Sequence, residues 1–345
     1  MSMETKIWKN TELEPAVKAL QKGQLVSFPT ETVYGLGADA FNEKAVSKVY
    51  AAKGRPSDNP LIVHVSRPET VQTYAQVDAR AQKLMDTFWP GPLTIILPIQ
   101  VGKLSALVTG GLQTVASRMP DNDLTRALID QVGSPLVGPS ANTSGKPSPT
   151  IANHVYHDLH GKIAGVLDDG ATKIGVESTV IDLSTPQAAI LRPGKITAEQ
   201  IEAILGESVD TSEHHVSADE APKAPGMKYR HYAPDKTVYM VKEADWTKAI
   251  IWAQSQLEPV GLMLSDQMIE AHHLAGMDFV WPLGPDGTTA AAKLFAGLRN
   301  FDDQKNVKMI LVAEMPLQPE NAAYNNRLAK ASGQQYFDAQ EMMDF

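Results

Sequence analysis

Apolar and polar positions follow two different patterns along the first two-thirds of the chain. Residues 11–22 carry apolar side chains three to four positions apart, which predicts a helix, and Gly23 is placed to end it. Residues 42–54 repeat this pattern between an N-cap asparagine and a glycine. Short, mostly apolar runs predict buried strands. The other elements expected here are helices near 78–88 and 198–205 and strands at 24–28, 61–65, 93–97, 114–118, 135–139, 163–167, 178–183 and 188–192.

The last third of the chain alternates regularly between strand and helix patterns. The expected order is strand 237–241, helix 244–256, strand 259–264, helix 266–274, strand 278–282, helix 288–301, strand 307–313 and helix 320–331. Such alternation predicts a parallel sheet covered by helices. Residues 207–235, in contrast, are polar and Pro-rich without periodicity, which is typical of a linker or a functional lid. We therefore expect a first domain over 1–206, a linker or lid over 207–235, and a second domain over 236–345.

Composition narrows the class of protein. The chain has 345 residues, of which 43% are hydrophobic and 21% charged, as in an ordinary globular protein. Its net charge of -9 argues against a broad basic face for nucleic acid, although a local basic pocket stays open. The absence of cysteine excludes disulfides, thiolate nucleophiles and Cys-ligated metal sites. No secretory leader pattern and no apolar run of about 18 residues occur, so we expect a cytoplasmic protein without a membrane span.

Side chains suited to phosphate gather between Lys53 and His64. Arg55 can bind a phosphate bidentately, and Lys53 can act as a point charge. The dipole of the preceding helix accounts for Lys53 equally well. His64 lies in an apolar strand, where a lone histidine is more often structural than catalytic. The segment therefore predicts a cationic turn that faces a polyanion.

Two further segments offer polar groups, each with an alternative. In the strand 114–118, alternation places Thr114 and Arg118 on one face, and a buried arginine needs either an anionic ligand or an internal salt bridge. The loop 139–150 is rich in hydroxyls and prolines, as in an anion-binding loop or a polar surface loop. The Gly-Leu-Gly at 35–37 lacks the third glycine of a dinucleotide fingerprint, and a simple glycine turn stays open.

In this order, the segments closely resemble the threonylcarbamoyl-AMP synthase family, with its YrdC-like fold, in the longer two-domain form. The matching motifs are Pro-Thr-Glu-Thr-Val-Tyr-Gly-Leu, Lys-x-Arg-Pro-x-x-x-Pro-Leu, Phe-Trp-Pro-Gly-Pro-Leu-Thr, Arg-Met-Pro, Pro-Ser-Ala-Asn-x-Ser-Gly, Glu-Ser-Thr-Val and Leu-Arg-Pro-Gly. The resemblance covers residues 20–235, including a linker motif over 224–234, and is weaker over 236–345. It implies an α/β fold: an N-terminal YrdC-like twisted mixed sheet with flanking helices around a concave pocket, and a smaller C-terminal Rossmann-like parallel α/β domain.

The resemblance also implies an activity and its residues. The family is a nucleotidyltransferase that makes threonylcarbamoyl-AMP and pyrophosphate from L-threonine, bicarbonate or carbon dioxide, and ATP. A downstream machinery transfers the threonylcarbamoyl group to tRNA. Lys53 and Arg55 are expected to be catalytic, with Mg²⁺ held by ATP phosphates rather than by a protein metal site. The implied ATP contacts are Arg55, Asn59, Thr114, Ser140, Ser148, Arg192, His231 and Tyr232. The implied threonine contacts are Thr32, His64, Arg118, Gly138 and Ser178.

The alternative is a protein of the same fold that binds structured RNA without catalysis. The net charge of -9 weighs against it, because binding to a phosphate backbone needs an extended basic surface. The sequence leaves direct tRNA contact, the oligomeric state and the role of the C-terminal domain open.

Overall fold

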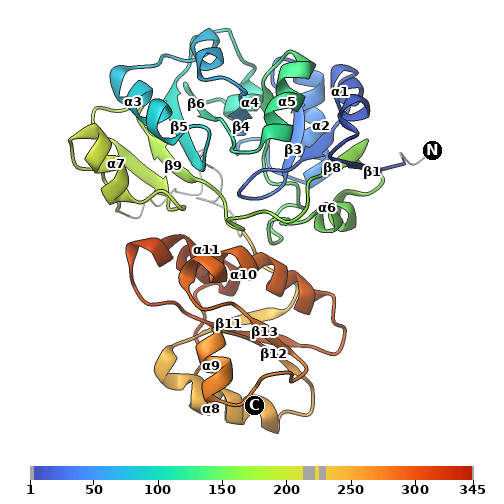
Figure 1. Ribbon diagram of the computed structural model, residues 1–345, viewed down its shortest axis with the longest axis vertical. Coiled ribbons are helices and arrows are strands. Elements are labelled where there is room, and N and C mark those ends of the chain that lie inside the picture. The colour runs from blue at the N-terminus through green and yellow to red at the C-terminus, as the bar shows by residue number, and fades with distance from the viewer. Residues whose placement is uncertain (1–3, 213–221, 225–230, 344–345) are drawn as a thin grey trace. The chain divides into compact units, whose positions relative to one another are not determined.

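The computed structural model describes residues 4–212, 222–224 and 231–343, which form two compact units (Figure 1). The first unit comprises Met1–Ser144, Ser148–Lys173 and Glu177–Tyr229. The second comprises Gly145–Pro147, Ile174–Val176 and Arg230–Phe345. The division near residue 230 falls inside the segment expected to be a linker. The two tripeptides that belong to the second unit were not expected from the sequence.

The described part of the first unit is built on one mixed sheet of ten strands, in the order β1-β8-β2-β3-β7-β4-β6-β5-β9-β10. Parallel pairs such as β4 with β6 and β5 with β9 stand beside antiparallel pairs such as β5 with β6. The sheet is therefore mixed, as expected. The strands are β1 (Lys6–Lys9), β2 (Val26–Phe28), β3 (Gly35–Asp39), β4 (Ile62–His64), β5 (Leu93–Pro98), β6 (Thr114–Arg118), β7 (Leu136–Val137), β8 (Gly165–Asp168), β9 (Thr179–Asp182) and β10 (Ala189–Arg192).

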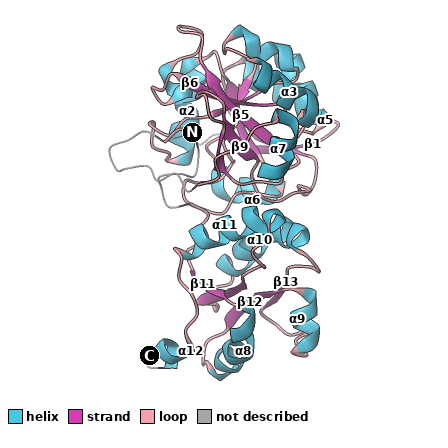
Figure 2. Cartoon of the chain, turned by 90° about the vertical axis from the view of Figure 1, so that its left-hand side faces the viewer, coloured by secondary structure: helices cyan, strands magenta, loops and turns pink. Residues whose placement is uncertain are grey.

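Helices flank this sheet (Figure 2), and two apolar clusters are buried in the unit. The helices are α1 (Leu13–Gln21), α2 (Glu43–Lys53), the 3₁₀ helix η1 (Pro68–Thr73), α3 (Ala79–Phe88), α4 (Ala106–Thr109), α5 (Asp123–Val132), α6 (Ala152–Leu159) and α7 (Ala198–Leu205). Asn42 caps α2 and Gly54 ends it with φ of 64°, as the sequence predicted. No described helix in either unit is long and apolar enough to cross a membrane.

Residues 35–39 form strand β3, which decides between the two alternatives for the Gly-Leu-Gly segment. Gly35 and Gly37 lie in an extended strand that pairs with β2, so the alternative of a glycine turn is wrong. A Cβ atom at Gly35 would come within 2.8 Å of the Phe28 ring, and one at Gly37 within 3.0 Å. The glycines are needed because this aromatic ring lies directly against the strand.

The second unit holds a separate sheet in the order β11-β14-β12-β13, and every strand pair in it is parallel, as predicted. Helices α10 and α11 cover one face of the sheet, and α8 and α9 the other (Figure 1). The strands are β11 (Thr237–Val241), β12 (Val260–Leu264), β13 (Val280–Pro282) and β14 (Met309–Ala313). The helices are η2 (Glu243–Asp245), α8 (Trp246–Ser255), α9 (Asp266–Ala271), α10 (Gly287–Asp302), η3 (Pro319–Asn321), α11 (Ala322–Ser332) and α12 (Ala339–Met343).

The tripeptide Gly145–Pro147 is held firmly inside the second unit. Lys146 Nζ lies 2.5 Å from a carboxylate oxygen of Asp235 and 3.3 Å from one of Asp302. The buried Arg299, on α10, donates from Nε to the carbonyl oxygen of Pro147 at 3.1 Å. Lys146 and Pro147 therefore make polar interactions with residues of the second unit that are far away in the sequence.

Candidate functional site

Strand register brings several of the predicted site residues to one face of the first sheet. His64 on β4 is the Cα partner of Arg118 on β6, and Ile62 is the partner of Ala116. Because side chains alternate along a strand, His64 and Arg118 share a face with the apolar pair beneath them. Thr114 stands on the same face at the start of β6. The predicted threonine contacts on β4 and β6 are thus neighbours.

The Arg118 guanidinium is buried and held by three protein groups. Its Nη1 donates to Thr32 Oγ1 at 2.9 Å, and its Nε donates to the Gly91 carbonyl at 3.2 Å. Its Nη2 lies 2.7 Å from Glu31 Oε2, and both side chains are 5% or less exposed. The internal salt bridge that the sequence left open is therefore confirmed. Thr32 is itself fixed by a 2.8 Å hydrogen bond between its hydroxyl and that of Thr30.

His64 is completely buried and neutral at physiological pH. Burial, with the positive charge of Arg118 nearby, lowers its pKa from 6.5 to about 3. Its Nδ1 lies 3.3 Å from the Ile62 carbonyl, and its ring packs edge-on against Phe28 with centroids 5.4 Å apart. If Nδ1 carries the proton that this carbonyl accepts, Nε2 is left as an acceptor. A Cβ atom on Gly138 would lie 2.6 Å from His64 Nδ1, so only glycine leaves room for this ring.

Ser178 joins the predicted threonine contacts to a predicted ATP contact. Arg192, at the end of β10, donates from Nη2 to Ser178 Oγ and from Nε to Ser178 O, both at 3.1 Å. The Ser178 hydroxyl also lies 2.7 Å from the hydroxyl of Thr94 on β5. All three side chains are buried. Thr94 was not predicted as a site residue, although alternation along its strand could have placed it on this face.

Lys53 ties the end of α2 to the loop 139–150. Its side chain is only 2% exposed, and Nζ donates to the carbonyl oxygens of Ser140 and of Asn142, the latter at 2.6 Å. The ammonium group therefore fixes the backbone of this loop. Its predicted action on phosphate charge stays a prediction.

The loop 139–150 is buried or half-buried along its whole length, so the alternative of an exposed surface loop is wrong. Ser148, one of its predicted ATP contacts, donates its hydroxyl proton to Glu177 Oε1. Glu177 opens the Glu-Ser-Thr-Val motif and is also buried. Apart from Gly145–Pro147, the loop is thus an ordered, hydroxyl-bearing part of the first unit.

Arg55 and Asn59 form a compact turn after α2. Arg55 Nη2 donates to the Pro60 carbonyl at 3.0 Å, and Nε lies 3.3 Å from the Asn59 carbonyl oxygen. The Tyr50 hydroxyl lies 3.1 Å from the same Asn59 carbonyl oxygen and 2.6 Å from that of Leu107, and burial raises the pKa of Tyr50 to about 12, so it stays a donor. The side-chain Oδ1 of Asn59 is buried without a hydrogen-bond partner among the described residues. This oxygen is available to a ligand.

His231 and Tyr232 belong to the second unit. The Tyr232 ring stacks on Phe295 with centroids 5.2 Å apart, and the Arg327 guanidinium lies 5.7 Å from its centroid. Tyr232 is 4% exposed and has a positive φ of 66°. The structure therefore places this ring among side chains of the second unit, and its predicted contact with ATP stays a prediction. The rest of the linker motif, 225–230, lies outside the described residues.

A short described segment of the expected lid, 222–224, packs on the sheet face that carries the site. Ala224 is fully buried against Ile62, Ile96, Ala116 and Val180. Since Ile62 and Ala116 share their face with His64 and Arg118, this segment covers the apolar floor next to those side chains.

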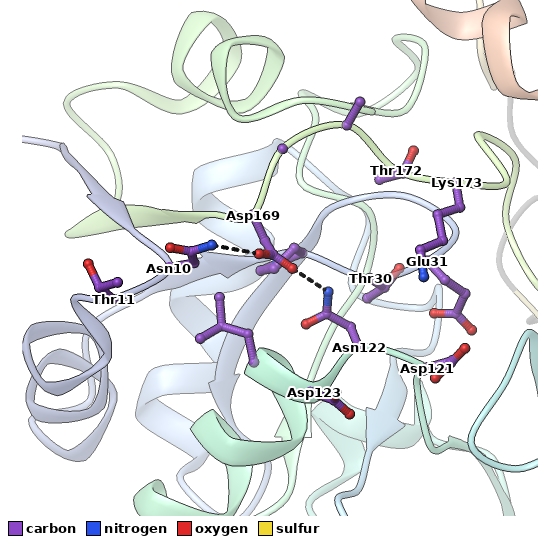
Figure 3. A pocket seen from close by; sticks show the side chains of 14 residues that line it. Asn10, Thr11, Thr30, Glu31, Asp121, Asn122, Asp123, Asp169, Thr172 and Lys173 are labelled. Atoms are coloured by element: carbon purple, nitrogen blue, oxygen red, sulfur yellow. Dashed lines mark hydrogen bonds between the residues drawn. The ribbon is translucent and has the colours of Figure 1, made fainter.

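A polar cavity of about 670 Å³ lies in the first unit, lined in part by Thr30 and Glu31, which contact Thr32 and Arg118 (Figure 3). Its lining residues are Asn10, Thr11, Pro29, Thr30, Glu31, Asp121, Asn122, Asp123, Leu124, Asp169, Gly170, Ala171, Thr172 and Lys173. Asp169 accepts hydrogen bonds from Asn10 at 3.2 Å and from Asn122 at 3.0 Å. None of the predicted site residues lines this cavity. Glu31 does, and it was not predicted as a site residue, although it stands between two threonines of the first motif.

Buried guanidinium and ammonium groups beside hydroxyls and a neutral imidazole suit the binding of carboxylates and phosphates. Within 4–212, 222–224 and 231–343, no group of three or more His, Cys, Asp or Glu side chains could hold a metal ion. The protein thus has a mixed α/β fold, and its buried cations have the chemistry to bind small anionic groups. The chain belongs to the threonylcarbamoyl-AMP synthase family, a family of nucleotidyltransferases.

Family models and relatives show this membership. The Sua5/YciO/YrdC model, described as telomere recombination, matches residues 18–194, and the model for the C-terminal domain of threonylcarbamoyl-AMP synthase matches 196–333. A threonylcarbamoyl-AMP synthase of Bacillus subtilis is 41% identical, covering 96% of this chain and 99% of the relative. One of Pyrococcus abyssi is 42% identical, covering 94% of each. The crystal structure of P. abyssi Sua5 complexed with L-threonine superposes with a TM-score of 0.86 at 39% identity, covering 98% of this chain and 99% of that one.

Proposed function

We propose that this protein makes threonylcarbamoyl-AMP from L-threonine, bicarbonate or carbon dioxide, and ATP, and releases pyrophosphate. One observation carries the proposal beyond family membership. Arg192, a predicted ATP contact, donates to the hydroxyl of Ser178, a predicted threonine contact, at 3.1 Å. A reaction that joins two substrates needs them bound close together, and the contact between these two predicted binding residues supports the proposal.

The threonine end of the site is formed by Arg118, His64 and Thr32. Arg118 supplies a fixed positive charge for the substrate carboxylate, because three protein groups prevent the guanidinium from turning. His64 is neutral, and its Nε2 would accept a hydrogen bond from the threonine hydroxyl. Gly138 keeps the space for this imidazole open.

The ATP end would use Arg55, Asn59 and Arg192 together with the loop of Ser140 and Ser148. Lys53 fixes that loop through two carbonyl oxygens and brings a positive charge next to it. Thr114, on the face of β6 that carries Arg118, is a further predicted ATP contact. The predicted contacts of His231 and Tyr232 with the nucleotide are part of the same proposal.

The chemistry requires no nucleophile from the protein. Threonine amine and bicarbonate give a carbamate and water, and a carbamate oxygen then attacks the α-phosphorus of ATP. A new phosphorus–oxygen bond forms while the bond to the bridging oxygen breaks and pyrophosphate leaves. The protein contributes position and positive charge, which stabilise the transition state. Each cation that faces the developing charge should contribute on the order of 3 kcal/mol.

Mg²⁺ fits this site as an ion carried by the nucleotide. The buried Asn59 Oδ1 is a neutral oxygen without a hydrogen-bond partner in the described part of the chain, and such oxygens accept hydrogen bonds from the water shell of Mg²⁺. Bound to the phosphates, the ion would neutralise charge on the leaving pyrophosphate.

The proposal is tested by incubating the protein with ATP, L-threonine and bicarbonate and measuring pyrophosphate. We expect release that requires threonine and yields threonylcarbamoyl-AMP by mass spectrometry. Pyrophosphate release that continues unchanged without threonine would contradict the proposal. Omitting bicarbonate under carbon dioxide-free gas tests the carbon source.

The product is a mixed anhydride of a carbamic acid and AMP, so a group-transfer machinery must consume it. We include in the proposal a downstream transfer of the threonylcarbamoyl group to tRNA and a cytoplasmic location. Filter binding to tRNA at several salt concentrations tests direct contact. Tight, steeply salt-dependent binding without ATP consumption would instead favour the RNA-binding alternative.

A further inference from the structure

The only role of the buried Glu31 carboxylate in the mechanism above is to hold Arg118 in place. Its Oε2 lies 2.7 Å from Arg118 Nη2, with side chains 4% and 5% exposed respectively. An ion pair that is removed from water is stable only when further hydrogen bonds satisfy both partners. Arg118 has such bonds, to Thr32 and to the Gly91 carbonyl.

Glu31 has none. Neither of its carboxylate oxygens has a hydrogen-bond partner among the described residues, and neither does Arg118 Nη2. The 2.7 Å contact is therefore an ion pair whose angles do not make a hydrogen bond. An unsatisfied acceptor thus lies beside an unsatisfied donor, and both are buried at an energetic cost.

A ligand that offers a donor and an acceptor side by side would satisfy both groups. The head group of a free α-amino acid does so, because its ammonium and carboxylate groups are joined through a single carbon. We propose that Glu31 accepts a hydrogen bond from the α-ammonium group of threonine while Arg118 binds the α-carboxylate. This inference rests on the proposed function and names the residue that selects for a free amino group.

The surroundings of Glu31 support this assignment. It directly precedes Thr32 in the chain, so a ligand that reaches Thr32 is close to the Glu31 backbone as well. On its other side lies the polar cavity, where Figure 3 shows Lys173 and Asp121 nearby. Within the described residues no ion pair joins Glu31 to Lys173, and the cation paired with its carboxylate is Arg118.

The test compares the binding of two ligands to the wild type, to one Glu31 variant and to one control variant. Calorimetry measures the binding of L-threonine and of the dihydroxy acid that carries a hydroxyl in place of the ammonium group. We expect Glu31→Gln to weaken threonine binding about 10- to 100-fold and to leave binding of the dihydroxy acid almost unchanged. Asp121→Asn is the matched control, because its carboxylate lines the same cavity but is 55% exposed, and it should change neither affinity.

Two other outcomes are possible for Glu31→Gln, and each would contradict the role proposed for Glu31. Equal losses for both ligands would mean that Glu31 only holds Arg118 in place, and no loss for threonine would mean that it does not touch the substrate. Either result overturns the inference. If Glu31→Gln does not fold, Glu31→Asp keeps the charge with a shorter reach and should show the same selective loss, whose absence also overturns it. A wild-type protein that binds threonine and releases pyrophosphate keeps the proposed function intact in all these cases.

Discussion

At the scale of single residues, Arg55 offers the sharpest test of the ATP end. Arg55→Ala should lower threonine-dependent pyrophosphate release about 100-fold, since one buried cation at a transition state contributes about 3 kcal/mol. Steady-state kinetics measure this loss, and circular dichroism checks the fold. Arg67→Ala is the control because Arg67 makes only a surface ion pair with Asp130. Unchanged turnover in Arg55→Ala would remove this residue from the site.

His64 makes the stability of the first unit depend on pH. Its pKa is about 3 in the folded chain and near 6.5 when unfolded, so between these values only the unfolded chain binds the proton. The stabilisation by neutral His64 is present above about pH 6.5 and decreases as the pH falls, by about 1.4 kcal/mol per unit. Urea unfolding between about pH 4 and pH 6 should therefore show a flatter dependence in His64→Gln. Equal slopes in the two proteins would contradict the buried neutral state.

The sequence predicted which residue types the site would use but not how they pair. The buried Arg118 clearly required an anion, yet only the position of the first motif against the end of β6 shows that Glu31 supplies it. Likewise, Gly138 was expected as a threonine contact, and the structure adds that it leaves room for His64. Such pairings depend on register between strands distant in sequence, which residue patterns do not encode.

At the scale of elements, the prediction succeeded where periodicity was long and caps were clear. Helix α2 and strand β6 match their expected positions. The patterns did not predict α5, although Asn122 caps it, Gly133 ends it, and Leu124, Leu128 and Val132 recur at helical spacing. They also did not predict β1, α4, α6 or α12. Strand β3 was missed because its glycines, which the Phe28 ring requires, look like a turn.

The segment 222–224 allows a test of whether the expected lid closes over the sheet face. Ala224→Asp would bury a charge among Ile62, Ile96 and Val180, at a cost of several kcal/mol, so the segment should leave the sheet face. We expect the KM for ATP to rise several-fold, because the segment no longer closes over that face. Ser212→Asp, at an exposed position of the same linker, should leave KM unchanged. An equal KM in both variants would argue against a lid.

At the scale of the whole molecule, Asp302 holds distant parts of the second unit together. It accepts the backbone N–H of Asp235 at 2.7 Å and of Lys236 at 3.2 Å, and it pairs with Lys146 at 3.3 Å. Asp302→Ala should lower the melting temperature by several degrees, since these groups lose a charged acceptor. Differential scanning calorimetry measures the change. Asp278→Ala, an exposed control in the same unit, should melt like the wild type.

The division of the chain into interleaved units has a consequence for its synthesis. The ribosome makes Gly145–Pro147 and Ile174–Val176 long before residues 230–345, to whose unit they belong. Translation proceeds from the N-terminus, and domains generally fold as they emerge. The first sheet can therefore form while the Pro147 carbonyl still lacks Arg299 and the Lys146 ammonium still lacks Asp302. The loop that carries Ser140 and Ser148 thus reaches its final state only when the last part of the chain has left the ribosome.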